Sequence, residues 1–328
     1  MWEVKMEGKQ PEIGVIMSVY NEKPSWLCEA IDSILEQTFQ GIRLYILLDK
    51  PDNEELRCII KEYQRKDTRI QFYENKQNLG LVKSLNKLIS LVEEPYIARM
   101  DADDISLRER LQKEIDFLER NHLDFVMAGA DYIDEENQKT TGDDIPNLNS
   151  KQIAECSKYG NVSIHSTWLL KRWVYEDLNG YRECKYCEDY DFILRCLQQN
   201  VKIGRLGEKL QLYRFRNTGI TAQNAYEQDE KVAYLRKCYR TNQRIDSLKI
   251  EDLNKRFSGA SGKQREKYCE ARKKIDQLAQ YLYCGDNKEV LKIFLTEGLT
   301  NKYFRKMFWN KFTGKMRLKR IYQNREKI

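Results

Sequence analysis

Runs of apolar residues alternate with amphipathic stretches through the first hundred residues of the chain. Residues 13–19 are almost all apolar, which is typical of a strand covered on both faces in a parallel sheet. After Ser25, a residue suited to capping a helix, apolar residues recur at helical spacing up to Leu35. Further strands are predicted at 44–48, 70–73 and 96–100, and further helices at 54–65 and through Leu85 and Leu88.

Strands that alternate with helices of this length predict right-handed βαβ units and a parallel sheet. Ligands of such sheets bind beyond the carboxyl ends of the strands. Polar residues stand at three of these ends: Tyr20-Asn21-Glu22, Asp49, and Asp101-Ala102-Asp103-Asp104. The sequence therefore predicts a ligand site at this edge of the sheet.

The pattern changes in the second half of the chain. Helices are predicted at 108–119 and 189–197, strands at 125–128 and 210–215, and a polar surface loop at 134–150. Beyond about residue 225 the strand signals stop, and helical stretches rich in charge follow at 231–245, 263–283 and 288–295. We therefore predict an α/β domain at 1–224, with halves at about 11–104 and 105–224, and a helical extension at 225–328.

The composition of the 328-residue chain, 33% charged and 41% hydrophobic, is that of a globular protein. No stretch approaches the roughly 20 apolar residues that span a bilayer, and Met1 to Gln10 is unlike a secretory signal. We expect a cytoplasmic protein with reduced thiols. Cys184-Lys-Tyr-Cys187 has no second pair to complete a zinc site, so an incidental thiol pair is favoured over a metal or redox site.

The net charge of +6 conceals a strong asymmetry. Residues 301–328 contain ten Lys or Arg and a single acid, Glu326, so the rest of the chain is slightly acidic. Phe304, Phe308 and Phe312 follow at helical spacing among these basic residues, a pattern that favours contact with an anionic membrane surface. The alternative is a solvated basic helix docked on its own acidic domain. Nucleic-acid binding ranks low, because no nucleic-acid fold is recognisable.

Three carboxylates in four residues, Asp101, Asp103 and Asp104, end an apolar strand. Charge repulsion destabilises such a cluster unless a cation neutralises it. Mg²⁺ or Mn²⁺ typically binds one or two carboxylates together with the phosphates of a substrate. This chemistry holds a nucleoside diphosphate and stabilises it as it departs. Asp104 has a second interpretation, as the cap of a helix beginning near Leu107. Arg99 could pair with the acidic cluster or with phosphate.

A second acidic group, Glu188-Asp189-Tyr190-Asp191, leads into a predicted helix. Acidic residues in a first helical turn also stabilise the helix dipole, which is the commoner reason for finding them there. Transfer of a sugar to a hydroxyl, however, needs a carboxylate that accepts the hydroxyl proton.

Taken together, these residues resemble glycosyltransferase family 2, which has the GT-A fold, a Rossmann-like mixed sheet flanked by helices. The resemblance covers roughly residues 11–221 and is strongest to the bacterial capsule and exopolysaccharide branch of the amylovoran-synthesis type. Its markers occur in the family's order: Ser18-Val19-Tyr20-Asn21-Glu22, Leu48-Asp49-Lys50-Pro51, Asn78-Leu79-Gly80, Leu85-Asn86, residues 98–104, His165-Ser166-Thr167, Gly180-Tyr181, Glu188-Asp189-Tyr190-Asp191 and Leu212-Tyr213-Arg214.

The resemblance implies a donor site in the first half of the domain. Asp49 would accept a hydrogen bond from uracil, Asp101 would bind ribose or metal, and Asp103 would coordinate Mn²⁺ or Mg²⁺ between the diphosphate oxygens. The other implied nucleotide-sugar contacts are Val19, Tyr20, Asn21, Glu22, Asn78, Gly80, Arg99, Ala102 and His165. His165 is nearly as well explained as a hydrogen-bonded structural histidine. Lys50 replaces a glycine of the related family pattern, which weakens the expectation for the base.

The resemblance also implies an acceptor site in the second half, with Asp189 as general base and Glu188 binding the acceptor or orienting its neighbour. We therefore predict an inverting glycosyltransferase, moving a sugar from a nucleotide sugar, expected to be a UDP-sugar, to a glycan or lipid-linked acceptor in cell-surface polysaccharide synthesis. Such an enzyme would be cytoplasmic and peripheral on the inner face of the plasma membrane. The sequence gives no indication of its oligomeric state.

Two other functions compete with this prediction. A nucleotidyltransferase would also use metal-binding carboxylates on a βαβ sheet, but residues 18–26 lack the expected Gly-rich phosphate loop. A non-catalytic assembly scaffold is disfavoured because both carboxylate clusters are intact.

Overall fold

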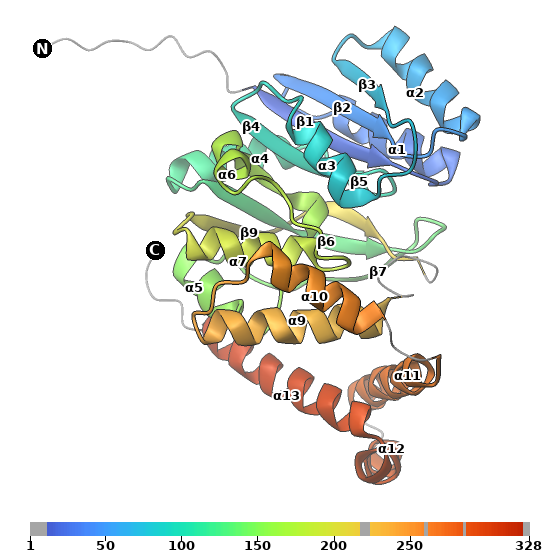
Figure 1. Cartoon of the computed structure of the whole chain (residues 1–328), viewed down its shortest axis with the longest axis vertical. Helices are drawn as coiled ribbons and strands as arrows, with labels where there is room; N and C mark the ends of the chain where they lie inside the picture. The colour runs from blue at the N-terminus through green and yellow to red at the C-terminus, as the bar shows by residue number, and fades with distance from the viewer. Residues whose placement is uncertain (1–11, 217–223, 259–261, 285–286, 324–328) are drawn as a thin grey trace, which may run out of the picture. The chain divides into compact units, whose positions relative to one another are not determined.

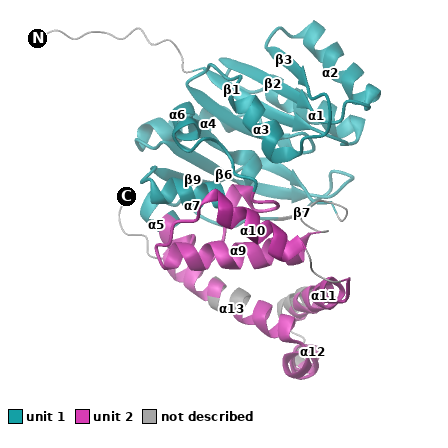
Figure 2. Cartoon of the chain, in the orientation of Figure 1, with its two compact units in different colours: residues 1–153, 162–183, 191–216 teal, residues 154–161, 184–190, 217–328 magenta. Residues whose placement is uncertain are grey.

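The computed structural model describes residues 12–216, 224–258, 262–284 and 287–323 (Figure 1). Pro11, residues 217–221 and residues 324–328, which belong to stretches interpreted above, lie outside the described residues. The chain divides into two compact units (Figure 2). We call Met1–Ile153, Val162–Glu183 and Asp191–Arg216 the sheet unit, and Ala154–Asn161, Cys184–Tyr190 and Asn217–Ile328 the helical unit.

The sheet unit is built on a mixed sheet of nine strands. Their order is β3-β2-β1-β4-β8-β6-β9-β5, with β7 paired to β6 outside this path. The strands are β1 (Ile13–Val19), β2 (Ile42–Leu48), β3 (Ile70–Glu74), β4 (Tyr96–Asp101), β5 (Ile105–Ser106), β6 (Phe125–Ile133), β7 (Lys139–Gly142), β8 (Leu169–Lys171) and β9 (Ile203–Arg214). The first four in this order, β3, β2, β1 and β4, are parallel, as the sequence predicts, and antiparallel pairing begins where β4 meets β8.

Helices pack on this sheet because the strand residues alternate between its two faces. Ile13, Val15 and Met17 of β1 are buried in one cluster with apolar residues of α1, α2 and α4. The helices of the sheet unit are α1 (Pro24–Leu35), α2 (Glu54–Lys66), α3 (Leu81–Ile89), α4 (Arg110–Arg120), α6 (Arg172–Asp177) and the 3₁₀ helix η1 (His165–Thr167). Helices α5 (Ser150–Cys156) and α7 (Glu188–Gln198) each contribute residues to both units. The predicted α/β class is thus confirmed.

Local chemistry sets the ends of these helices. The side chain of Asn53 accepts a hydrogen bond from the backbone N–H of Leu56 and caps α2, with Glu54 and Glu55 in its first turn. Helix α4 begins at Arg110, later than predicted. Strand β9 begins at Ile203, seven residues before the predicted strand. The sequence pattern does not indicate this first part because Gly204 and Gly207 interrupt its apolar residues. The segment predicted as one loop at 134–150 contains β7.

The helical unit contains α9 (Ala225–Arg240), α10 (Ser247–Ser258), α11 (Gly262–Cys284), α12 (Asn287–Thr300) and α13 (Lys302–Gln323). These helices form the predicted C-terminal helical part of the chain. Phe304 is fully buried in their common core with Tyr268, Ile275 and Ile293, and Phe308 packs against the same core. Two of the three phenylalanines predicted to face a membrane therefore point into the unit. The side chain of Phe312 lies outside the described residues.

Over the described ranges, none of the helices combines the length and the apolar character needed to cross a membrane.

Candidate active site

The parallel register brings the three polar strand ends together. Ser18 of β1 lies opposite Asp101 of β4, and Val19 lies opposite Leu48 of β2. The backbone N–H of Asp49 donates to the carbonyl oxygen of Val19 at 2.7 Å. Tyr20-Asn21-Glu22, Asp49 and the acidic run 101–104 thus lie along one edge of the sheet, which we call the acidic edge.

The carboxylate of Asp49 holds a loop. It is 3% exposed and accepts hydrogen bonds from Asn75 Nδ2 at 2.7 Å and from the backbone N–H groups of Leu79 and Gly80, both at 2.8 Å. Gly80 has a φ of 83°, a conformation that favours glycine. Asp49 therefore shapes the loop that carries Asn78 and Gly80, and a direct contact with a uracil ring stays a prediction.

Lys50 connects two of the strand ends. Its Nζ donates to Asn21 Oδ1 at 2.8 Å and lies 5.8 Å from the centre of the Tyr20 ring. The φ angle of Lys50 is not positive, so this position does not need the backbone conformation that favours glycine. The replacement of glycine at this position is therefore accommodated without strain, and it ties the Tyr20-Asn21 segment to the end of β2.

Arg99 pairs with the acidic cluster, which decides between its two sequence interpretations. Its guanidinium is buried and donates to both carboxylate oxygens of Asp101, at 2.8 and 2.5 Å. Such bidentate pairs fix orientation as well as charge. Asp101 is therefore held in place on β4, and its remaining lone pairs are available to a ligand.

Asp103 lies in a strongly perturbed position of the acidic edge. Burial, together with the charge of Asp101, raises the pKa of Asp103 to about 7, while Arg216 acts in the opposite sense. Burial also raises the pKa of Glu22, which lies near the same carboxylates. An Arg216 guanidinium nitrogen lies 2.7 Å from Asp103 Oδ2, and the sequence pattern does not single out this residue. Its position two residues after the Arg214 marker is the only hint.

These carboxylates suit a divalent cation. Within the described residues, no three or more His, Cys, Asp or Glu side chains are arranged as a complete metal site. Mg²⁺ and Mn²⁺, however, commonly take one or two carboxylates and complete their shell with substrate phosphates. Asp103 and Asp101 provide these one or two carboxylates. Because ionised carboxylates repel one another at this site, a divalent cation would relieve the repulsion, and the residues therefore fit such a cation.

Asp104 has a different role from the helix cap considered above. It accepts from Ser166 Oγ at 2.6 Å and from the backbone N–H of Arg214 at 2.8 Å, and it is 1% exposed. Arg214 Nε in turn donates to the carbonyl oxygen of Asp103 at 2.7 Å. Asp104 therefore joins the acidic edge to η1 and to the end of β9. The cap interpretation fails because α4 starts at Arg110, one turn too late.

His165 is held by neighbouring aromatic residues. Its Nε2 and Tyr181 Oη are 2.7 Å apart, and its ring packs on Trp168. Burial, with the nearby positive charge of Arg99, keeps the pKa of His165 well below its usual value, so the imidazole is neutral. These contacts suit a structural histidine, and a role beside the phosphates stays a prediction.

The Gly180-Tyr181 marker is explained by Asn86 of α3. Asn86 Nδ2 donates to the Tyr181 carbonyl oxygen and Asn86 Oδ1 accepts from the Tyr181 N–H, both at 2.8 Å. Gly180 has a φ of 64°, and a Cβ atom there would lie 2.3 Å from Asn86 Oδ1. The turn therefore requires glycine for its backbone and for space.

Glu188 and Asp189 form the first turn of α7 and belong to the helical unit. Asn161 Nδ2 donates to Asp189 Oδ2 at 2.9 Å. Asp191 differs from both: it is 1% exposed and bound by Arg182 and Arg195, so its role is structural. The catalytic roles of Glu188 and Asp189, and their meeting with Asp103, stay predictions.

Cys184 and Cys187 are buried free thiols with their sulfur atoms 3.3 Å apart.

Comparisons with known proteins identify the family of this chain. Residues 14–178 match the model of glycosyl transferase family 2. An uncharacterised glycosyltransferase of Methanocaldococcus jannaschii is 34% identical over 212 residues, covering 64% of this chain and 73% of the relative. The amylovoran biosynthesis glycosyltransferase AmsE of Erwinia amylovora is 28% identical over 198 residues, covering 60% of this chain and 73% of AmsE.

Solved structures show the same fold. The structure of Staphylococcus aureus TarS residues 1–349 in complex with UDP-GlcNAc matches with a TM-score of 0.60 at 16% identity, covering 89% of this chain and 93% of the TarS chain. Sheet topology, ordered markers and matched sequence thus agree, and the chain belongs to glycosyltransferase family 2 with the GT-A fold.

Proposed function

We propose that this glycosyltransferase is inverting and transfers a sugar from a UDP-sugar to a hydroxyl of a glycan or lipid-linked acceptor during cell-surface polysaccharide synthesis. The observation that carries the donor half of this proposal is the acidic edge, where burial and like charge raise the pKa of Asp103 to about 7. The solved TarS complexes with UDP and with UDP-GlcNAc support a uridine nucleotide.

In this proposal the nucleoside lies against Val19, Tyr20, Asn21 and Glu22, beside the loop that Asp49 holds. Asn78 and Gly80 form the wall next to the base and ribose. Ala102 and His165 complete the contacts, with Arg99 orienting Asp101. The loop is already fixed by three hydrogen bonds to Asp49, so little ordering would be needed on binding.

Asp103 and Asp101 would hold Mn²⁺ or Mg²⁺, which neutralises the diphosphate and stabilises its charge as it leaves. Arg216 contacts Asp103 and stacks 5.7 Å from the Trp26 ring, so it is placed to add a further positive charge there.

We assign the acceptor step to the first turn of α7. The Asp189 carboxylate accepts the proton of the acceptor hydroxyl as that oxygen bonds to the anomeric carbon. The bond from this carbon to the diphosphate oxygen breaks, and its electron pair leaves with the nucleotide. Attack opposite the leaving group inverts the centre, so an α-linked donor gives a β-glycoside. Glu188 would bind the acceptor or orient Asp189.

The first experiment is a screen of UDP-sugars for Mn²⁺-dependent binding and slow hydrolysis by wild type, Asp103→Asn and Asp177→Asn. Asp177 is an exposed acid of α6 and serves as the matched control. We expect Asp103→Asn to lose metal-dependent binding at least about tenfold, because one charged ligand is replaced by a neutral one. Absence of any metal-dependent binding to wild type would refute the donor assignment.

We also propose that the helical unit contacts an anionic membrane, peripherally and on the cytoplasmic side. Its exposed apolar residues lie mainly on α12 rather than on α13: Leu291, Phe294, Leu295 and Leu299 are 42–78% exposed. They share one side of α12, at spacings of three and four residues. Arg305 donates to the carbonyl oxygens of Gly298 and Leu299, so a positive charge borders this strip. Apolar residues edged by basic ones suit an anionic lipid surface.

A further inference from the structure

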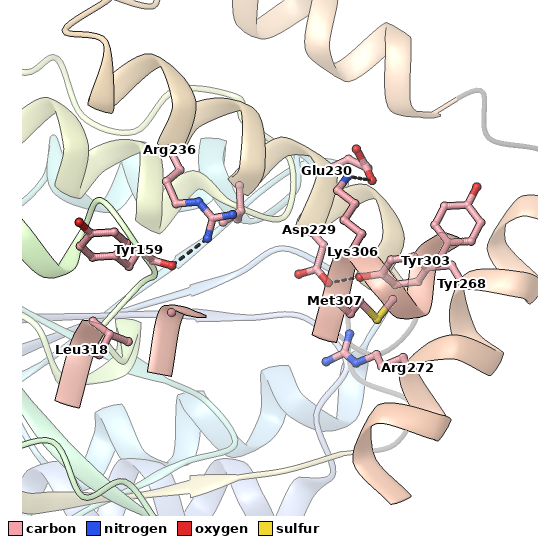
Figure 3. Close-up of a pocket in the computed structure, with 12 residues that line it drawn as sticks. Tyr159, Asp229, Glu230, Arg236, Tyr268, Arg272, Tyr303, Lys306, Met307 and Leu318 are labelled. Atoms are coloured by element: carbon pink, nitrogen blue, oxygen red, sulfur yellow. Dashed lines mark hydrogen bonds and ion pairs between the residues drawn. The ribbon is translucent and has the colours of Figure 1, made fainter. Parts of the chain in front are cut away.

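The helical unit contains a pocket of about 310 Å³ that the predicted sugar-transfer site does not use (Figure 3). Helix α9 contributes Asp229, Glu230 and Arg236, and α11 contributes Tyr268 and Arg272. Helix α13 and Tyr159 complete the walls. Its volume is at the lower end of the roughly 300–1,000 Å³ typical of small-molecule sites, which suits one small ligand.

The acidic side chains of this pocket already have partners within it. Lys306 Nζ lies 2.5 Å from a carboxylate oxygen of Glu230, and the Tyr268 hydroxyl donates to Asp229 (Figure 3). The charge of Lys306 balances that of Glu230, whereas the Tyr268 hydroxyl leaves the charge of Asp229 uncompensated. Three basic side chains against two acidic ones still give the pocket lining a positive net charge.

Two arginines carry this positive charge. Arg236 donates to the carbonyl oxygen of Tyr159 at 2.8 Å and forms no salt bridge with any described residue. Burial, with Arg240 nearby, lowers the pKa of Arg236. Arg272 is half-buried and has neither a hydrogen bond nor an ion pair within the described ranges. In Figure 3, Arg236 lies on the Tyr159 side of the pocket and Arg272 on the side of Met307.

More positive charge surrounds Tyr159. The guanidinium carbons of Arg240 and Arg317 lie 5.1 and 5.0 Å from the centre of its ring. Guanidinium groups without carboxylate partners present several N–H donors in a fork that matches phosphate oxygens. Their combined field would attract an anion into the pocket.

Met307 and Leu318 add apolar surface, and Tyr303 a phenol, beside these donors. A sugar ring has apolar C–H faces and a polar rim, so it matches such a lining. We propose that this pocket binds a sugar phosphate, namely the phosphorylated part of the acceptor. The naming of the acceptor rests on the proposed function, whereas the site itself rests on the unpaired arginines. The phosphate could belong to a lipid-linked or a free glycan, since both present the same chemistry.

The test titrates the full chain with glucose 1-phosphate by NMR or calorimetry, in wild type, Arg272→Gln and Arg236→Gln. The matched controls are Lys267→Gln on α11 and Lys237→Gln on α9, exposed lysines that remove the same charge. We expect about tenfold weaker binding in each arginine variant, the loss of a charge-assisted hydrogen bond, and no change in the controls. Arg272→Gln removes no described contact, so it should fold normally.

Three results would overturn the proposal: no binding to wild type, equal binding to Arg272→Gln, or an equal loss in the lysine controls. Arg272-dependent binding of phosphatidylglycerol vesicles without affinity for glucose 1-phosphate would also overturn it, in favour of a lipid headgroup. Inorganic phosphate that binds as tightly as glucose 1-phosphate would remove the sugar from the assignment. Asp103→Asn should leave the titration unchanged. Metal-dependent UDP-sugar binding, measured separately, should persist in Arg272→Gln, so failure of one proposal is distinct from failure of the other.

Discussion

The acidic edge of the sheet unit and the pocket of the helical unit both contain charged side chains in an unfavourable setting, negative at the edge and positive in the pocket. At the acidic edge, burial and then the charge of neighbouring carboxylates raise the pKa values of Asp103 and Asp104. In the pocket, Arg236 and Arg272 lack salt-bridge partners among the described residues. Folding gains nothing from burying charged groups that are crowded or left without a salt-bridge partner, so each arrangement indicates a ligand of the opposite sign. The comparison teaches that a donor metal and an acceptor anion are expected in different units.

The largest expected effect concerns Asp189, a carboxylate of the helical unit that should behave unlike those of the acidic edge. Asp189→Asn should lower transfer by at least about 100-fold, because the hydroxyl proton loses its acceptor, while UDP-sugar binding stays nearly unchanged. Kinetics of transfer together with donor titration check this. Asp177→Asn is the control, and full transfer activity of Asp189→Asn would remove this residue from its role.

A smaller effect is expected at the exposed strip of α12. Leu295→Asp should reduce flotation with phosphatidylglycerol liposomes about tenfold, since a charge replaces an apolar anchor. Thr296→Asp adds the same charge to the same helix outside the strip and should float almost like wild type. If both variants float equally with wild type, α12 does not contact the lipid. If Leu295→Asp instead changes the molecular mass in light scattering, the strip is a protein interface.

The smallest expected effect concerns the pH dependence of stability that the buried carboxylate of Asp103 causes. The pKa of Asp103 is raised from 3.8 to about 7 in the folded chain, so its contribution to stability is complete below pH 3.8 and is lost as the pH rises from there through about 7. In chelator, the free energy of unfolding of wild type should fall by about 1 kcal/mol more between pH 6 and 8 than that of Asp103→Asn. Urea denaturation measures both. Parallel pH profiles would show that burial costs the ionised Asp103 nothing.

The fold was largely predictable because its signals are local. Apolar runs such as 13–19 mark buried parallel strands, and the acidic run 101–104 follows β4 as expected. Strand β9 was predicted only in its second half, because glycines carry no apolar signal. The antiparallel insertion of β8 between β4 and β6 depends on contacts distant in sequence, which periodicity does not encode.

The candidate site was predictable in its residues but less so in their roles. Sequence placed Asp49 at a strand end, whereas its three hydrogen bonds to Asn75, Leu79 and Gly80 depend on how a later loop folds back. Arg216 has no sequence signal because a basic residue after a strand is common, and its contact with Asp103 arises only in the folded chain. Phe304 has the spacing of a membrane-facing residue, yet the same spacing serves a helix that packs on α11 and α12.

The interlock between Asn86 and Gly180 has a consequence for the way this protein can diverge. The amide of Asn86 fills the space that any side chain at position 180 would need, and it bonds both backbone groups of the next residue. A mutation at either position alone therefore leaves either a collision or two unmatched polar groups. We therefore expect positions 86 and 180, although distant in sequence, to change together during evolution.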